Sequence, residues 1–320
     1  MITIFFNYVF LTGLAIRLLA IVFALPLMQD NWFLPFVGTF LDQISFDPWS
    51  SFIKTGGDPL AYPYGPVMLL AHSIGAGLGL LIDTISNTSI FFAIGYKATL
   101  LVADICCFVL LDRIFPNKTN KILFLYWLSP IVIIAIYWTG QSDIIPISLF
   151  VLALYCVKNN QFKTAALWFG LAVGAKFSMG AGLPFFLLYL WKNKRLNKFF
   201  GAATATLLCV MAITHAVPLL SPGFQTMVIS TPETNRMVGL SLSVGRGVEI
   251  YVAPLLFLLA VYFVWRLPRF SFELLMALLG VSFFVILLVT PAPINWYVWL
   301  LPFLVFHQLS AERQQIFFTQ

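Results

Sequence analysis

The sequence predicts an all-α polytopic membrane protein with about ten transmembrane helices and with juxtamembrane helices in its first external loop. Three observations predict this class. Hydrophobic residues fill 61% of the 320 positions and charged residues only 9%, whereas roughly a quarter of the residues in a soluble domain are charged. The mean hydropathy is +0.94. Apolar runs recur along the whole chain, so residues 1–320 are expected to form a single transmembrane domain.

The apolar runs give the candidate spans. The first run lacks the basic start and the short apolar core of a cleaved signal, and it is expected to be a retained span. Two short runs meet at Lys176-Phe177-Ser178 and form either a tight helical hairpin or one broken helix. The candidate spans lie near residues 4–28, 90–111, 122–138, 143–157, 164–177, 178–191, 199–219, 249–265, 270–290 and 294–310.

A polar segment, Gln29–Pro66, interrupts this pattern. It contains four aspartates and ends in Tyr62-Pro63-Tyr64-Gly65-Pro66. Hydrocarbon satisfies neither an irregular backbone nor bare carboxylates, so the segment must lie outside the bilayer core. We expect residues 29–89 to form the first extracytoplasmic loop and residues 220–248 to form the second large one.

The distribution of basic residues predicts the orientation. If residues 64–82 do not cross the membrane, twelve of the eighteen Lys and Arg lie in turns on one side, which the positive-inside rule assigns to the cytoplasm. If they cross, the bias inverts. Residues 64–82 are therefore predicted to be an outer juxtamembrane or re-entrant helix, and both termini are predicted to be cytoplasmic. The outer face is then acidic, with a few isolated cations.

Two polar positions need an explanation. Asp143 opens a span after Gly140-Gln141-Ser142, where it is either a helix N-cap or, together with Gln141, a ligand for sugar hydroxyls. Lys176 ends an outer span, against the positive-inside rule. It either extends to the outer interface or supplies a point charge for a lipid-linked phosphate.

Charges deep within the spans are expected to be paired, because an unpaired charge at mid-bilayer costs about 2.5–3.5 kcal/mol. Lys97 and Asp104 are seven residues apart and share a helix face, and Arg17 is similarly deep. We expect an Arg17–Asp104 pair that serves the scaffold. Neither the four cysteines nor the three scattered histidines indicate a disulfide framework or a metal site. Basic strips with interleaved aromatics are missing, so nucleic-acid binding is not expected.

Four sequence motifs, in order, resemble those of the polytopic GT-C glycosyltransferases, in particular mannosyltransferase-like members that use polyprenyl-phosphate-linked sugars. They are Gly56-Gly57-Asp58-Pro59 with Tyr62-Pro63-Tyr64-Gly65-Pro66; Trp127-Leu128-Ser129-Pro130 with Gly140-Gln141-Ser142-Asp143; Gly170–Lys176; and Asn295-Trp296-Tyr297-Val298-Trp299-Leu300-Leu301-Pro302. The chain departs from the family pattern in its short length and in having Pro-Tyr-Gly-Pro where the family has Tyr-Pro-Pro.

The resemblance implies transfer of a sugar, a hexose such as mannose, from a polyprenyl-phosphate carrier to a hydroxyl acceptor outside the cytoplasm, with inversion. A carboxylate of the first outer loop would be the base, in the order Asp47, Asp42 and Asp30, although Asp47 is equally suited to capping a short helix. Neither a metal nor a cofactor other than the lipid-linked co-substrate is expected. The donor phosphate is assigned to Lys176, Arg236 and Arg246, and the sugar or acceptor to Gln141, Asp143, Tyr62, Tyr64 and Trp296.

Two other functions are compatible with a polytopic chain that carries intramembrane charges. One is a transporter or lipid-carrier flippase, which the lack of an internal repeat argues against. The other is a non-catalytic membrane subunit. The expected partners are the lipid donor, a glycan, glycolipid or protein acceptor, and the bilayer. The expected location is a bacterial inner membrane, and an endoplasmic-reticulum membrane would give the same topology.

Overall fold

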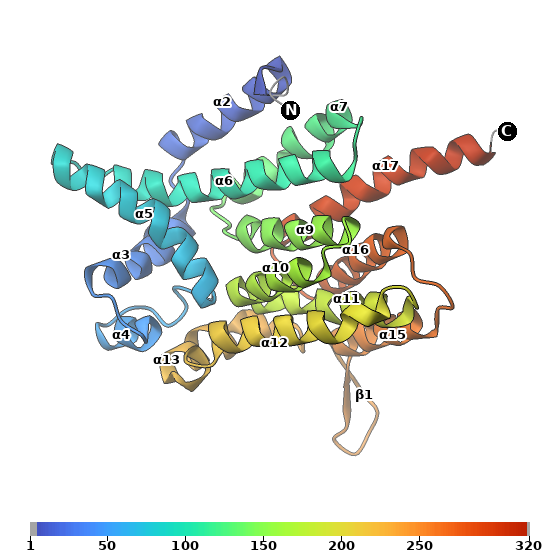
Figure 1. Ribbon diagram of the computed structural model, residues 1–320. Helices are drawn as coiled ribbons and strands as arrows, with labels where there is room; N and C mark the ends of the chain where they lie inside the picture. The colour runs from blue at the N-terminus through green and yellow to red at the C-terminus, as the bar shows by residue number, and fades with distance from the viewer. Residues whose placement is uncertain (1–4, 319–320) are drawn as a thin grey trace.

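The computed structural model describes residues 5–318 and is built almost entirely of helices (Figure 1). Residues 1–4 and 319–320 lie outside the described part, including the first residue of the predicted span 4–28. The α-helices are α2 (Tyr8–Phe23), α3 (Leu34–Asp42), α4 (Pro48–Lys54), α5 (Pro66–Ser86), α6 (Phe91–Ile114), α7 (Thr119–Ile122), α8 (Pro130–Ile133), α9 (Ile144–Lys158), α10 (Phe162–Ala175), α11 (Leu183–Lys192), α12 (Phe200–His215), α13 (Pro222–Phe224), α14 (Pro232–Arg236), α15 (Val252–Arg266), α16 (Phe272–Val289) and α17 (Leu301–Phe318).

Shorter helical turns extend or join these helices. The π-helical turns are η1 (Gln29–Phe33), η2 (Leu123–Trp127), η3 (Ile134–Trp138) and η7 (Gln225–Ile229), and the 3₁₀ turns are η4 (Phe177–Gly182), η5 (Asn197–Phe199), η6 (Pro218–Leu220) and η8 (Ile294–Trp299). Two strands, β1 (Ser241–Ser243) and β2 (Glu249–Tyr251), pair antiparallel in a hairpin that projects away from the bundle in Figure 1.

The structure supports the predicted all-helical membrane class. Judged by helix length, however, the described residues contain fewer candidate spans than the ten predicted. Within residues 5–318, four helices are long and apolar enough to cross a membrane: α5, α6, Asn197–His215 and α16. A fifth span arises if Thr119–Trp127 and Pro130–Trp138, bent by 47° at their junction, count as one. Other apolar helices, such as the 15-residue α9, are shorter than the roughly 20 residues that a straight crossing needs. Ten spans are thus not established.

The helices around Lys176 form a hairpin. Helix α10 ends at Ala175 because the backbone of Lys176 is extended (φ −152°, ψ 124°). The 3₁₀ turn η4 then leads into α11, which runs back along the bundle (Figure 1). Of the two alternatives predicted for residues 164–191, a helical hairpin or one broken helix, the structure has the hairpin.

Of the predicted segment 64–82, residues 66–82 lie in one uninterrupted helix, α5. Its start is fixed to the end of α10, because the Gly65 amide donates to the carbonyl oxygen of Ala175 at 2.9 Å. Along its length it packs on α6 through Gly75, Gly79 and Gly95, where a Cβ atom would overlap the opposing backbone. By length and composition α5 is one of the candidate spans, so its predicted juxtamembrane position stays a prediction.

The predicted outer loop contains helices α3 and α4, which lie with α13 at one end of the bundle (Figure 1). Helix α4 begins with the pairing of Asp47 and the Ser50 amide. Helix α13 packs directly on α4. The two predicted outer loops therefore meet at the same end of the molecule.

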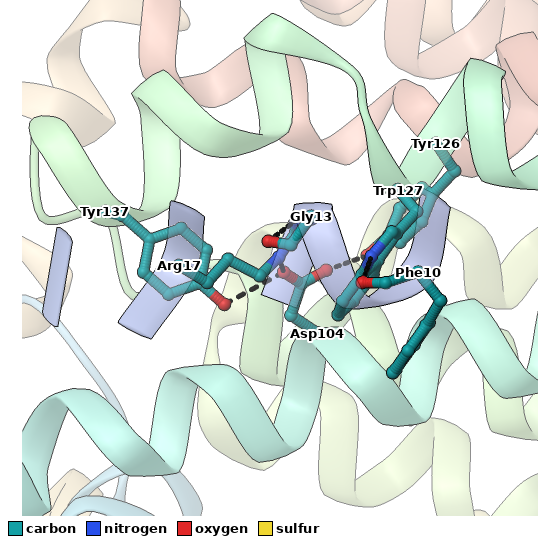
Figure 2. A network of polar contacts seen from close by, with 7 residues as sticks. All are labelled: Phe10, Gly13, Arg17, Asp104, Tyr126, Trp127 and Tyr137. Carbon is teal, nitrogen blue, oxygen red and sulfur yellow. Dashed lines mark hydrogen bonds and ion pairs between the residues drawn. The ribbon is translucent and has the colours of Figure 1, made fainter. Parts of the chain in front are cut away.

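The predicted Arg17–Asp104 pair is confirmed (Figure 2). Arg17 Nε donates to Asp104 Oδ2 at 2.6 Å, and the hydroxyls of Tyr126 and Tyr137 donate to the same carboxylate at 2.8 and 2.9 Å. The guanidinium also lies 3.6 Å from the ring centroid of Trp127. Arg17 and Asp104 are fully buried, so the cluster joins α2, α6, η2 and η3 as scaffold.

Lys97 does not pair with Asp104. Its ammonium donates to the carbonyl oxygens of Ala24 at 2.7 Å and Ile21 at 3.3 Å. These carbonyls end helix α2 and have no partner within it. Lys97 therefore caps α2 and joins it to α6.

Asp104→Asn should lower the stability of the fold strongly, because it leaves the buried Arg17 without its counter-charge. Loss of one partner of a buried pair costs about 3–5 kcal/mol. Thermal unfolding of the purified protein in detergent measures the change. The exposed Asp42 at the end of α3 gives a matched control, and Asp42→Asn should change stability by no more than about 0.5 kcal/mol. Equal melting of both variants would contradict the scaffold role.

Candidate functional site

The centre of the candidate site is an ion pair between Asp143 and Lys176. Asp143 precedes α9 and Lys176 follows α10, and the two helices pack against each other along their length. The Lys176 ammonium lies 2.8 Å from Asp143 Oδ1 and 2.7 Å from Oδ2. Asp143 occupies the N-cap position of α9, as one alternative predicted, but its side chain makes no capping hydrogen bond there and pairs with Lys176 instead.

The surroundings of the pair bury the acid and leave the base partly open. Asp143 is completely buried, whereas 14% of the Lys176 side chain is exposed. Trp299 Nε1 also donates to Asp143 Oδ2 at 2.6 Å. Since the ammonium turns inward to Asp143, Lys176 does not extend to the interface as the alternative interpretation required.

Three aromatic rings surround the ammonium. Its distances to the ring centroids are 5.0 Å for Trp299, 5.1 Å for Tyr64 and 5.4 Å for Trp296, within the range of cation–π attraction. Burial, and then the nearby Asp143 carboxylate, raise the pKa of Tyr64 well above that of an ordinary tyrosine. Its hydroxyl therefore stays protonated at neutral pH.

A pocket of about 260 Å³ opens in front of Lys176. Its polar wall comes from Ser178, Thr231 and Thr234, and its apolar wall includes Met237 and the two tryptophans of η8. Arg236 is not among the lining residues but neighbours one of them: its guanidinium is 5.9 Å from the Trp296 ring centroid, and Nη1 donates to the Pro291 carbonyl at 3.1 Å. Two cations thus flank Trp296.

An apolar groove continues from this pocket. A cavity of about 360 Å³ shares Phe177, Ser178, Met237 and Trp299 with the Lys176 pocket. Through Pro184 it adjoins a further cavity of about 460 Å³. We call these two cavities together the α11–α15 groove. The groove follows α11 and α15 as far as Trp191 and Trp265. The Ser178 hydroxyl at its mouth is buried and has no hydrogen-bond partner.

Gln141 and Tyr62 support the site from behind and do not line the pocket. Gln141 is buried, and its Oε1 accepts from Asn295 Nδ2 at 3.0 Å. This bond ties the Gly140–Asp143 turn to η8. The Tyr62 hydroxyl pairs with His72 Nδ1 at 2.9 Å, and its ring stacks on Phe36.

The three candidate bases do not line the Lys176 pocket. Asp42 is exposed at the end of α3, and Asp30 is half-buried in η1. Asp47 accepts hydrogen bonds from the Ser50 amide at 3.1 Å and from the Ser221 hydroxyl at 2.5 Å. The capping alternative for Asp47 thus describes its observed contacts. The structure does not bring these acids to the predicted phosphate-binding residues.

The pKa of Asp47 reflects these contacts. Partial burial raises the pKa, but the hydrogen bonds from Ser221 and Ser50 outweigh this effect. The pKa of Asp47 is consequently below the usual value for an aspartate. A low pKa makes the carboxylate a weak proton acceptor, which argues against its use as a general base.

Arg246 is also separate from the site. It lies in the turn of the β1–β2 hairpin with a positive φ of 51°, is exposed, and is not among the residues that line the Lys176 pocket. Within residues 5–318, groups of three or more His, Cys, Asp or Glu that could hold a metal ion are not found.

Sequence reasoning missed Trp299, Ser178 and Asn295 as members of the site. The spacing of Trp296 and Trp299 was a usable signal, because residues three apart share a face of a 3₁₀ helix. The proximity of Ser178 to Lys176 in sequence was another. The Gln141–Asn295 bond joins residues 154 positions apart and leaves no local signal.

The chain matches no protein-family model, no curated protein and no solved structure.

Lys176→Met should destabilise the fold, because it leaves the buried Asp143 carboxylate without its cation. The expected loss is about 3–5 kcal/mol, measured by thermal unfolding in detergent. Lys54→Met, at the exposed end of α4, is the control and should have little effect. An unchanged melting temperature for Lys176→Met would show that the ion pair does not hold α9 and α10 together.

Asp47→Asn should destabilise the protein in a pH-dependent way. The pKa of Asp47 is lower in the folded protein than in the unfolded chain, where it is about 3.9. The ionised form therefore contributes stability that is complete above the unfolded pKa and disappears as the pH falls through the folded pKa. The stability gap between the wild type and Asp47→Asn should be constant near neutral pH and narrow below about pH 4. Measuring the unfolding of both proteins across this pH range tests the prediction. A stability difference that widens in acid would contradict it.

Proposed function

We propose that the protein is a membrane glycosyltransferase that moves a sugar, a hexose such as mannose, from a polyprenyl-phosphate carrier to a hydroxyl acceptor on the extracytoplasmic face. The observation that carries the proposal is the union of a cationic pocket at Lys176 with the apolar α11–α15 groove. A polyprenyl-phosphate sugar has the same division, with an anionic headgroup followed by a long hydrocarbon chain. The resemblance of the four motifs to GT-C glycosyltransferases supports the same substrate class.

The phosphate would be bound by Lys176 and Arg236. Lys176 is fixed by Asp143, and its exposed side faces the pocket, so its charge needs no reorientation when a phosphate arrives. Arg236 could grip phosphate oxygens in a fork, whereas lysine acts as a point charge. As the bond from the anomeric carbon to the phosphate oxygen breaks, the electron pair moves to the phosphate, and both cations stabilise it.

A carboxylate would take the proton of the acceptor hydroxyl as its oxygen attacks the anomeric carbon opposite the phosphate. Asp47 is held by Ser50 and Ser221, and Asp42 is exposed away from the pocket. Asp30 is favoured among the three, because the adjacent Gln29 Nε2 donates to the Gly140 carbonyl at 3.1 Å. This contact connects η1 to the turn that carries Asp143.

The proposal includes the predicted topology of ten spans, cytoplasmic termini, and outer loops at residues 29–89 and 220–248. The contact of α4 with α13 and the bond between Gly65 and Ala175 support it, because they bring both loops and Lys176 to one end of the bundle. Such a protein would act in a bacterial inner membrane or in an endoplasmic-reticulum membrane.

Purified protein with synthetic polyprenyl-phosphate sugars and a panel of hydroxyl acceptors tests the function. Lys176→Gln should lower kcat/KM by about 10²-fold or more through loss of phosphate stabilisation. Asp30→Asn should lower kcat by at least about 10²-fold through loss of the base, and the exposed Lys54→Gln should behave as wild type.

Transfer at the wild-type rate in Asp30→Asn, Asp42→Asn and Asp47→Asn would remove the outer-loop base from the mechanism. Counterflow of labelled substrate in liposomes without any product would instead identify a transporter or flippase.

A further inference from the structure

Helix α4 of the first outer segment is joined to α13 of the second by a compact set of polar contacts. The Ser221 hydroxyl donates to Asp47 Oδ1 at 2.5 Å and lies 3.2 Å from the Ser50 hydroxyl. The Gly223 amide donates to Ser50 Oγ at 2.9 Å. These four residues, Asp47, Ser50, Ser221 and Gly223, are called the α4–α13 contact below.

Close packing adds to the hydrogen bonds. The Trp49 and Phe224 rings meet edge to face with centroids 4.8 Å apart, and both side chains are buried. Gly223 lies so near the backbone of Ser50 that a Cβ atom would overlap it. The approach of α13 to α4 is therefore set by a position that only glycine fills without a shift.

The chain that leaves this contact forms one wall of the Lys176 pocket. Turn η7 follows α13 directly, and Val228, Thr231, Thr234 and Met237 line the pocket. Arg236 on the same segment lies over Trp296 and bonds to the Pro291 carbonyl. Beyond Met237 the chain is exposed through the β1–β2 hairpin, so this wall depends on its anchor at α13.

We propose that the α4–α13 contact is a positioning device that holds residues 225–237, and with them Arg236, at the mouth of the Lys176 pocket. Asp47 is then a positioning residue that acts through Ser221 and does not touch the substrate. The structural part of this inference is independent of the reaction, and only its kinetic consequence depends on the proposed function.

Limited trypsin digestion of the purified protein in detergent tests the positioning. Arg236 is half-buried, whereas Arg246 in the hairpin turn is exposed, so Arg246 is an internal control on the same segment. Ser221→Ala removes a hydrogen bond to a charged acceptor and should increase cleavage after Arg236 by roughly tenfold, because cleavage follows the population of the opened form. Cleavage after Arg246 should stay constant.

Three further variants separate the contact itself from general unfolding. Gly223→Ala keeps every polar group but forces α13 away from α4, and should also accelerate cleavage after Arg236. Ser221→Thr keeps the hydroxyl and should restore the wild-type pattern. Thr226→Ala, which removes an exposed hydroxyl of η7 bonded only to the Pro222 carbonyl, should change nothing. Wild-type cleavage after Arg236 in both Ser221→Ala and Gly223→Ala would overturn the proposal.

Kinetics with a synthetic polyprenyl-phosphate sugar separate positioning from catalysis. Ser221→Ala and Asp47→Asn should each raise KM for this donor by about tenfold while kcat is retained. If Asp47→Asn abolishes turnover without changing cleavage after Arg236, Asp47 acts on the substrate and the proposal fails. If the wild type transfers no sugar, the proposed function fails, and the digestion still decides the positioning role.

Discussion

The candidate site depends on the ion pair between Asp143 and Lys176. A buried carboxylate is costly unless a cation and hydrogen-bond donors surround it. Asp143 receives the cation from Lys176 and a further hydrogen bond from Trp299. The pair joins the start of α9 to the end of α10. It also fixes the direction of the Lys176 ammonium, while the partly exposed Lys176 side chain lines the pocket.

A further buried ion pair joins Arg17 and Asp104. Comparing it with the Lys176–Asp143 pair distinguishes a scaffold contact from a candidate binding site. Arg17 and Asp104 are both completely enclosed, and their other hydrogen-bond partners, two tyrosines and the Gly13 carbonyl, belong to the same bundle. Lys176 keeps 14% of its side chain exposed and borders a cavity with further hydroxyl groups. A charged side chain can bind a ligand only if the fold leaves part of it accessible, and of these two pairs only Lys176–Asp143 meets this condition.

Sequence reasoning predicted the parts of the molecule that follow from local chemistry. The helical class follows from apolar runs in a medium that cannot hydrogen bond to backbone, and the Arg17–Asp104 pair follows from the cost of isolated charge. Lys176 was found because it violates the charge bias. Capping by Asp47 was one of the predicted alternatives, but its bond to Ser221 was not predictable, because Ser221 lies 174 positions away.

Two residues that were predicted to line the site lie elsewhere for a similar reason. Tyr62 is near the site in sequence, but its hydroxyl pairs with His72 Nδ1 and not with a residue of the site. Arg246 is on the expected outer segment, but a β-hairpin carries it away from the pocket. Which way a side chain points from a loop depends on tertiary contacts, and neither periodicity nor charge bias contains that information.

The π-helical turn η3 has a consequence for how the chain tolerates length changes. A π turn holds one residue more than an α turn. Turn η3 ends at Trp138, and only Thr139 separates it from Gly140, whose φ of 78° starts the turn to Asp143. Deleting a single residue between 134 and 138 would let this turn relax to the α form, so the loss would be absorbed where it occurs. The same deletion inside the regular helix α9 would instead rotate the remainder of that helix by about 100° relative to the acid that fixes Lys176.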